Sequence, residues 1–194
     1  KFLQRQSIVS MPASEPVVVA PSPEFYRWAF ASMWTPGPFE SKPSRAYYYL
    51  TDADRSWPAD RQEEHLRYFN FPILWHISIH EVYPGHFLHF QHLRNVDSKV
   101  RKSTFFGPAS FIEGWAHYCE QMMVEAGFRR QEPEIKLGQL AEALVRLARF
   151  VVCIRNDGYP EDIRKRSSCA SSIACFPTHK RPRWIIFASW MNPA

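Results

Sequence analysis

His80-Glu81-Val82-Tyr83-Pro84-Gly85-His86 is the stretch that decides the fold, because it places two imidazoles and a carboxylate close together in the chain. A second carboxylate, Glu113, follows within Phe111-Ile112-Glu113-Gly114-Trp115, on what we expect to be a separate helix. Two neutral imidazoles and one carboxylate, with a fourth position open, are the usual ligands of a hydrolytic zinc site. A glutamate directly after the first histidine is where such sites keep their general base. The two stretches therefore predict a zinc hydrolase.

The spacing of the two histidines departs from the short zinc motif H-E-x-x-H. On a regular helix, His80 and His86 would lie roughly 240° apart around the axis. Both can bind one metal only if the helix is distorted between them. Pro84 lacks the backbone N–H that would bond to the carbonyl of His80, and Gly85 tolerates unusual dihedral angles. We therefore expect a bulge at Pro84-Gly85 that turns His86 back toward His80.

A rival metal pair consists of His76 and His80, which share one face of a regular helix without any distortion. We interpret His89 and His92 as residues of the polar helix face or as neighbours of the ligands. A purely structural role for the whole stretch is the remaining alternative.

HEVYPGHFLHFQ (80–91) and FIEGWAHYCEQMMVEAGF (111–128) resemble the signature of a large bacterial family, domain of unknown function 885. The resemblance covers roughly Met11 to Asp157. The family is grouped with the zincin-like metallopeptidases whose third ligand is a glutamate on a later helix. The resemblance also implies a longer protein, of which this chain is a fragment that lacks a mainly helical N-terminal region.

The resemblance assigns roles to individual residues. It implies His80, His86 and Glu113 as the ligands of one Zn²⁺ ion, and Glu81 as the general base. Zinc is also the metal that these ligand types favour over manganese or cobalt.

Three polar residues of the second stretch share one helix face, because Glu113, His117 and Glu120 recur at steps of four and three residues. Two roles stay open for Glu120: it accepts a hydrogen bond from the far nitrogen of a ligand histidine, or it forms a structural salt bridge. His117 is either a reserve ligand or a polar neighbour of the site.

The periodicity of the chain predicts a mainly α fold with a small β component, an α+β class. The resemblance implies that residues 1–157 form an incomplete zincin-like catalytic core. Its predicted parts are a strand-containing segment (11–51), active-site helices (60–94 and 108–127) and a packing helix (132–156). Residues 158–194 show no sustained period, and we interpret them as an atypical tail that is frame-disrupted or disordered.

Two short runs predict strands: Val17–Val19 and Ser44–Leu50. In zincin folds a strand beside the active-site helix pairs with extended substrate. By this analogy Tyr47 and Tyr49 are candidate substrate contacts, and so is Tyr83.

Apolar residues recur at helical steps in the predicted packing helix, which predicts a buried core face. They are Leu137, Leu140, Leu144, Leu147 and Val151. Cys119 and Cys153 fall in helical patterns and are expected to be buried thiols. Cys169 and Cys175 match no common zinc motif.

Composition excludes several classes of protein. The 194 residues, 45% hydrophobic and 22% charged, are typical of one globular domain. A net charge of +5 is too modest to indicate nucleic-acid binding. No apolar run has the length of a membrane-spanning helix. The compartment, cytoplasmic or exported, and the oligomeric state stay open.

These features together predict a zinc metallopeptidase that acts on peptide substrates. The alternative is a non-catalytic metal-binding protein or pseudoenzyme, inactive because its flanking regions are missing.

Overall fold

The computed structural model describes residues 1–12, 15–40, 45–103 and 107–158, with the side chains of residues 150 and 152–158 left out of the description. The chain divides into two compact units. The first holds Lys1–Pro23 and Ala31–Gln139, and the second holds Glu24–Phe30 and the chain from Leu140 onward. The predicted tail, with Cys169 and Cys175, lies outside the described residues from 159 onward.

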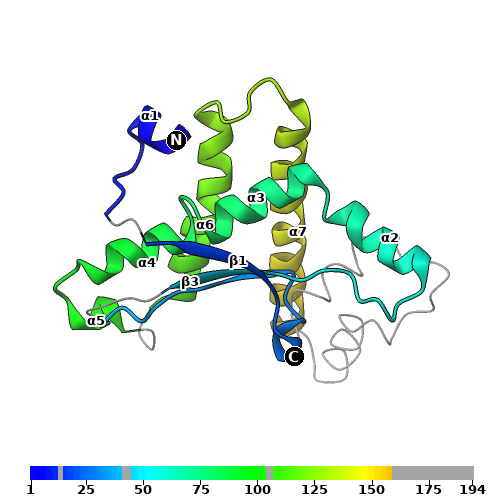
Figure 1. Ribbon diagram of the computed structural model, residues 1–194, viewed down its shortest axis with the longest axis horizontal. Coiled ribbons are helices and arrows are strands. Elements are labelled where there is room, and N and C mark those ends of the chain that lie inside the picture. The colour runs from blue at the N-terminus through cyan, green and yellow to red at the C-terminus, as the bar shows by residue number, and fades with distance from the viewer. Residues whose placement is uncertain (13–14, 41–44, 104–106, 159–194) are drawn as a thin grey trace. The chain divides into compact units, whose positions relative to one another are not determined.

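Helices dominate the described chain and a small sheet accompanies them (Figure 1), which confirms the predicted α+β class. The helices are α1 (Phe2–Gln6), α2 (Ala59–Tyr68), α3 (Phe71–Glu81), α4 (His86–Arg94), α5 (Lys99–Lys102), α6 (Ala109–Glu125) and α7 (Pro133–Gly158), with a 3₁₀ turn, η1, at Glu24–Tyr26. The strands are β1 (Val17–Pro21), β2 (Ala31–Trp34) and β3 (Ala46–Leu50).

The sheet has the order β1-β3-β2, with β1 parallel and β2 antiparallel to the central strand β3. Both predicted strands are present, whereas β2 was not predicted because its stretch is rich in aromatic residues and proline. Tyr48 of β3 faces α3, where its hydroxyl lies 3.0 Å from Ser78 Oγ. Because β3 is paired on both sides, it cannot accept a substrate strand as the analogy proposed, and β2 is the edge strand that contacts α3.

Helix α3 begins at an asparagine cap, where the Asn70 side chain accepts a hydrogen bond from the backbone N–H of Ile73. Pro72 stands in the first turn, where its missing N–H costs nothing. Ile79 near the other end is buried in a hydrophobic cluster with Cys119 of α6. The Asn70 cap at the start of α3 and the buried Ile79 near its end therefore fix the position of the helix and of its last turn.

The chain between α3 and α4 differs from the predicted bulge, because α3 ends at Glu81 and a new helix begins at His86. The connecting residues contain a cis Tyr83-Pro84 peptide bond. The backbone N–H of Gly85 donates to the carbonyl of Ile79 over 3.0 Å, and a Cβ at Gly85 would overlap the carbonyl group of His80. Only glycine can pass this close to the end of α3, so the predicted distortion exists in the form of a tight loop.

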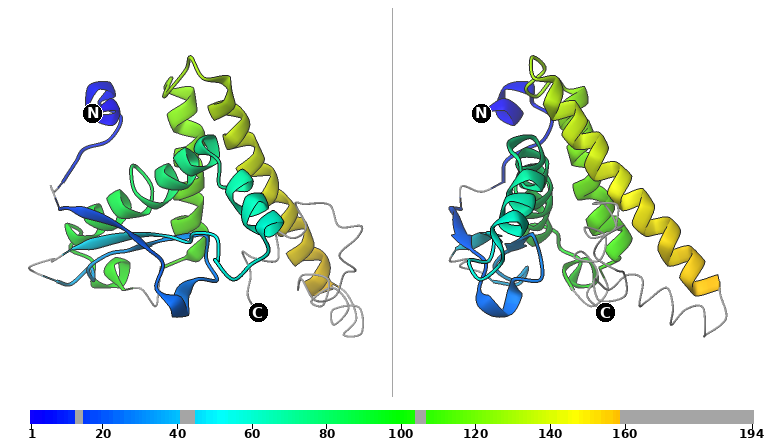
Figure 2. Two further views of the ribbon diagram at one scale, coloured as in Figure 1. Left: turned by 45° about the vertical axis from the view of Figure 1, so that its right-hand side comes forward. Right: turned by 90° about the vertical axis from the view of Figure 1, so that its right-hand side faces the viewer.

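Helix α6 crosses the place where α3 is followed by α4 (Figures 1 and 2). Its inward side carries Cys119 and Met123, which pack with Leu3 and Ile79. Burial of Cys119 is confirmed, and the crossing brings the first turns of α6 to the loop between α3 and α4.

Helix α7 corrects the sequence analysis, because its predicted core face is exposed. The exposed residues are Leu137, Leu140, Leu144, Leu147 and Val151, each between 46% and 68% accessible. The buried positions include Ile135 and Gly138 instead, and a Cβ at Gly138 would come within 3.2 Å of Pro72 and 3.1 Å of His76. Close approach at Gly138 thus places this residue, and not the exposed Leu137, against α3. Among the described helices, none combines the length and apolar character needed to cross a membrane.

Candidate metal centre

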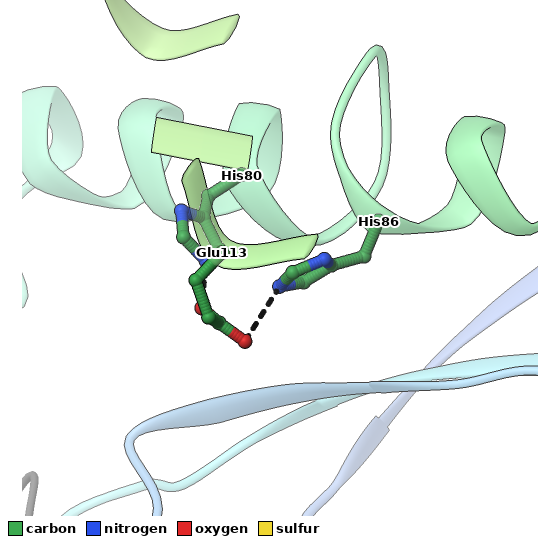
Figure 3. Close-up of side chains that lie close together, drawn as sticks. All are labelled: His80, His86 and Glu113. Atoms are coloured by element: carbon green, nitrogen blue, oxygen red, sulfur yellow. Dashed lines mark ion pairs between the residues drawn. The ribbon is translucent and has the colours of Figure 1, made fainter. Parts of the chain in front are cut away.

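Three side chains from three helices meet in one group (Figure 3). His80 stands in the last turn of α3, His86 is the first residue of α4, and Glu113 lies near the start of α6. One nitrogen or oxygen atom from each lies within 4.8 Å of the other two. The loop after α3 therefore does bring two histidines of irregular spacing to a common point.

The distances within this group fit a metal site better than direct hydrogen bonds. His80 Nε2 lies 3.4 Å from Glu113 Oε2, and His86 Nε2 lies 3.6 Å from Glu113 Oε1. Good N–H···O bonds are shorter, about 2.7–3.2 Å. Two ligands of a tetrahedral Zn²⁺, with bonds of about 2.0–2.2 Å, lie roughly 3.3–3.6 Å apart. Each histidine nitrogen thus lies from a Glu113 oxygen at a distance that neighbouring ligands of one metal ion would have, His80 from Oε2 and His86 from Oε1.

Glu113 is the accessible and anionic member of the group. Contact with the His80 ring, and then with the His86 ring, holds the pKa of Glu113 far below its usual range, although partial burial opposes this. The Glu113 carboxylate is therefore deprotonated at neutral pH, as a metal ligand must be. The Glu113 side chain is 64% exposed, which leaves one side of the group open to solvent. Water or substrate can enter there.

Glu120 supports the His80 ring from behind. Its Oε1 lies 2.8 Å from His80 Nδ1, and the residue has no exposed surface. A buried carboxylate at this distance accepts the Nδ1–H, and the other ring nitrogen, Nε2, faces Glu113. Of the two predicted roles for Glu120, the structure therefore favours hydrogen bonding to His80.

His86, the second histidine of the group, lacks such support. His86 Nδ1 is buried and has no hydrogen-bond partner among the described residues. The His86 ring stands nearly perpendicular to that of His80, with centroids 4.7 Å apart. Its direction depends on its place at the start of α4.

Glu81, the predicted base, follows His80 at the end of α3. Burial raises the pKa of Glu81, while the nearby His80 and His86 rings lower it. The backbone N–H of Met33 in β2 donates a hydrogen bond to the carboxylate. Glu81 is thereby held between α3 and the edge strand β2.

The two alternative ligands lie outside the donor group. His76 is fully buried, and its Nε2 lies 2.6 Å from the backbone carbonyl of Ile135, so the rival His76/His80 pair is not formed. His117 Nδ1 lies 3.7 Å from Glu120 Oε2 on the same helix. Its position matches the predicted polar neighbour and not a ligand.

The three tyrosines predicted as substrate contacts lie in two different parts of the structure. Because strand side chains alternate, Tyr47 and Tyr49 project from the face of β3 opposite Tyr48, where their rings stack at 5.6 Å. Tyr83 packs edge-on against Phe87 at 5.3 Å, next to the hydrophobic cluster. Tyr47 and Tyr49 thus lie on the side of the sheet away from α3.

Sequence reasoning missed two groups that position the site. Trp115 Nε1 donates to the carbonyl of Pro84 over 3.1 Å and so ties α6 to the loop that orients His86. The conspicuous Glu-Gly-Trp triplet was the available signal for this contact. The Met33 N–H has no signal of its own, because β2 itself was not predicted.

Comparison with known proteins places this α+β chain with its His₂Glu group in a family. A family model described as a bacterial protein of unknown function (DUF885) matches residues 1–155. The chain therefore belongs to the DUF885 family. Among proteins with curated descriptions, no match was found.

Two solved structures resemble the chain. One is "a putative lipoprotein of unknown function" from Shewanella oneidensis, with a TM-score of 0.64 and 31% identity, covering 78% of this chain and 26% of that one. The other is a "putative lipoprotein" from Colwellia psychrerythraea, with a TM-score of 0.57 and 20% identity, covering 98% of this chain and 31% of that one; it supports the fold alone. The chain spans about a quarter to a third of the length of these relatives.

Proposed function

We propose that the chain carries the catalytic centre of a zinc-dependent metallopeptidase with a zincin-like arrangement. The observation that carries this proposal is the convergence of His80, His86 and Glu113 at ligand spacing, with Glu81 directly after the first ligand.

The reaction follows from the roles of these side chains. The zinc ion would be held by His80, His86 and Glu113. When bound, it would polarise the carbonyl group of the substrate and lower the pKa of the attacking water. Glu81 accepts the proton of the attacking water and returns it to the leaving amine. The hydrogen bond from Met33 keeps the Glu81 carboxylate in place during both transfers.

The sheet offers a place for an extended substrate. Strand β2 is an edge strand, and the contact between Met33 and Glu81 brings its backbone to the base. A peptide added along this edge would use backbone groups of β2 that are bonded neither to β3 nor to Glu81. We therefore assign peptides as the substrate class.

The test separates metal binding from catalysis. Metal analysis of the purified protein should find one zinc ion per chain, and His80→Ala or His86→Ala should lose it. Glu81→Gln should retain zinc while cleavage of a mixed synthetic peptide set, read by mass spectrometry, falls at least about 100-fold. Zinc binding without any cleavage by the wild-type chain would instead support the non-catalytic alternative, and full activity in Glu81→Gln would remove Glu81 as base.

A further inference from the structure

The carboxylate of Glu120 faces two imidazoles and not only one. Its Oε1 lies 2.8 Å from His80 Nδ1, and its other oxygen, Oε2, lies 3.7 Å from His117 Nδ1. Glu120 has no exposed surface, whereas 36% of the His117 side chain is exposed. The carboxylate therefore connects a buried histidine of the candidate metal centre to a partly exposed histidine of α6.

The spacing of these residues along α6 explains why they meet. His117 follows Glu113 by four residues and precedes Glu120 by three, so all three share one face of the helix. Helical side chains lean toward the N-terminus of their helix, which brings the Glu120 carboxylate back toward His117. The face of α6 that supplies Glu113 to the donor group thus also carries His117 and Glu120.

The neutral His117 ring carries its proton on Nδ1 because of the atoms around it. This nitrogen is buried and has no hydrogen-bond partner among the described residues. The neighbouring Glu120 carboxylate attracts an N–H and repels the lone pair of an unprotonated ring nitrogen. The separation of 3.7 Å exceeds that of good hydrogen bonds, about 2.7–3.2 Å, so the contact is a modest electrostatic attraction.

We propose that His117 is a positioning residue of the metal centre and that it acts through Glu120. The last torsion of a glutamate side chain is broad, so a carboxylate held at one oxygen alone can turn. Attraction of Oε2 to His117 restricts this rotation and keeps Oε1 at His80 Nδ1, while His80 Nε2 faces Glu113. This inference rests on the proposed function and deepens it, because it adds a residue that orients a zinc ligand.

The experiment measures the zinc affinity of the full chain by competition with a chelator, apart from any turnover. His117→Leu should lower the affinity by roughly 2- to 5-fold, the range expected when a weak charge contact is lost. His117→Asn should retain wild-type affinity, because the asparagine amide places an N–H donor near the position of Nδ1. His117→Gln, whose longer side chain places its donor farther out, should behave as His117→Leu does. Gln121→Leu, a polar-to-apolar change at an exposed position of α6, is the matched control and should bind zinc normally.

A double-mutant cycle separates this role from a contribution to folding. Adding His117→Leu to Glu120→Gln should lower zinc affinity no further, because the charge through which His117 acts is already gone. Urea unfolding of metal-free His117→Leu should show no loss of stability. Wild-type zinc affinity in His117→Leu, equal losses in the Asn and Gln variants, or a fully additive loss in the double variant would overturn the positioning role and leave the proposed function standing. A wild-type chain that binds no zinc would overturn both.

Discussion

Replacing Glu120 with glutamine isolates the support that a buried carboxylate gives to a ligand histidine. The change keeps the shape of the side chain but removes its charge, at a contact of 2.8 Å to His80 Nδ1 with no solvent exposure. A hydrogen bond to a charged group contributes about 1.5–3 kcal/mol, against about 0.5–1.5 kcal/mol between neutral groups. The difference is about 1–1.5 kcal/mol, and since about 1.4 kcal/mol corresponds to a tenfold change, zinc affinity should fall by roughly 5- to 10-fold.

The assay is competition for zinc against a chromophoric chelator at neutral pH. Glu125→Gln is the matched control, because it makes the same chemical change on the same helix at an exposed side chain that bonds only to neighbouring Gln121 in the described contacts. Urea unfolding of the metal-free variant should show little loss of stability, since burying a carboxylate is itself costly. Zinc affinity of Glu120→Gln within about twofold of wild type would refute the supporting role.

Two further predictions concern the scaffold. Gly85→Ala should lower the free energy of unfolding by about 2–4 kcal/mol, because the new Cβ overlaps the His80 carbonyl and the backbone must move. Gly37→Ala, where the nearest atom is 4.0 Å away, is its control, and equal urea midpoints for the two variants would contradict the close approach. Burial raises the pKa of the Cys119 thiol from 9.0 to about 12, so this thiol should resist alkylation at pH 8 until the protein unfolds. The contribution of the protonated Cys119 thiol to the free energy of unfolding is fully present below pH 9 and is lost as the pH rises toward 12. Rapid native labelling of Cys119, mapped by mass spectrometry, would show that the site is open.

The donor residues were predictable because their chemistry is local. Two imidazoles, a following glutamate and a proline-glycine break all lie within one short stretch, His80 to His86. The spacing alone required a distortion, and the structure contains one. That it is a loop between two helices follows from a contact in space, the passage of Gly85 beside the His80 carbonyl. No pattern in the sequence predicts how closely Gly85 approaches the His80 carbonyl.

The strands of the sheet were likewise predictable only in part. The β-branched run of β1 and the tyrosine run of β3 predicted strands from local preference. Strand β2 has a weaker local signal, and it forms because β3 provides a partner along its length. Its placement beside α3, which gives Glu81 the Met33 hydrogen bond, therefore depends on pairing between distant segments.

The sequence by itself determined the α+β class, the longer helices and the residues of the candidate donor group, since these depend on local propensity and side-chain chemistry. Only the tertiary structure decided which residues at the start of α7 are buried. The leucine period predicted burial of Leu137, but Gly138 lies against Pro72 and His76 and Leu137 is exposed. The tertiary structure likewise joined Glu120 to His80. Both outcomes arise from contacts between residues far apart in the chain, whose energies exist only once the chain has folded.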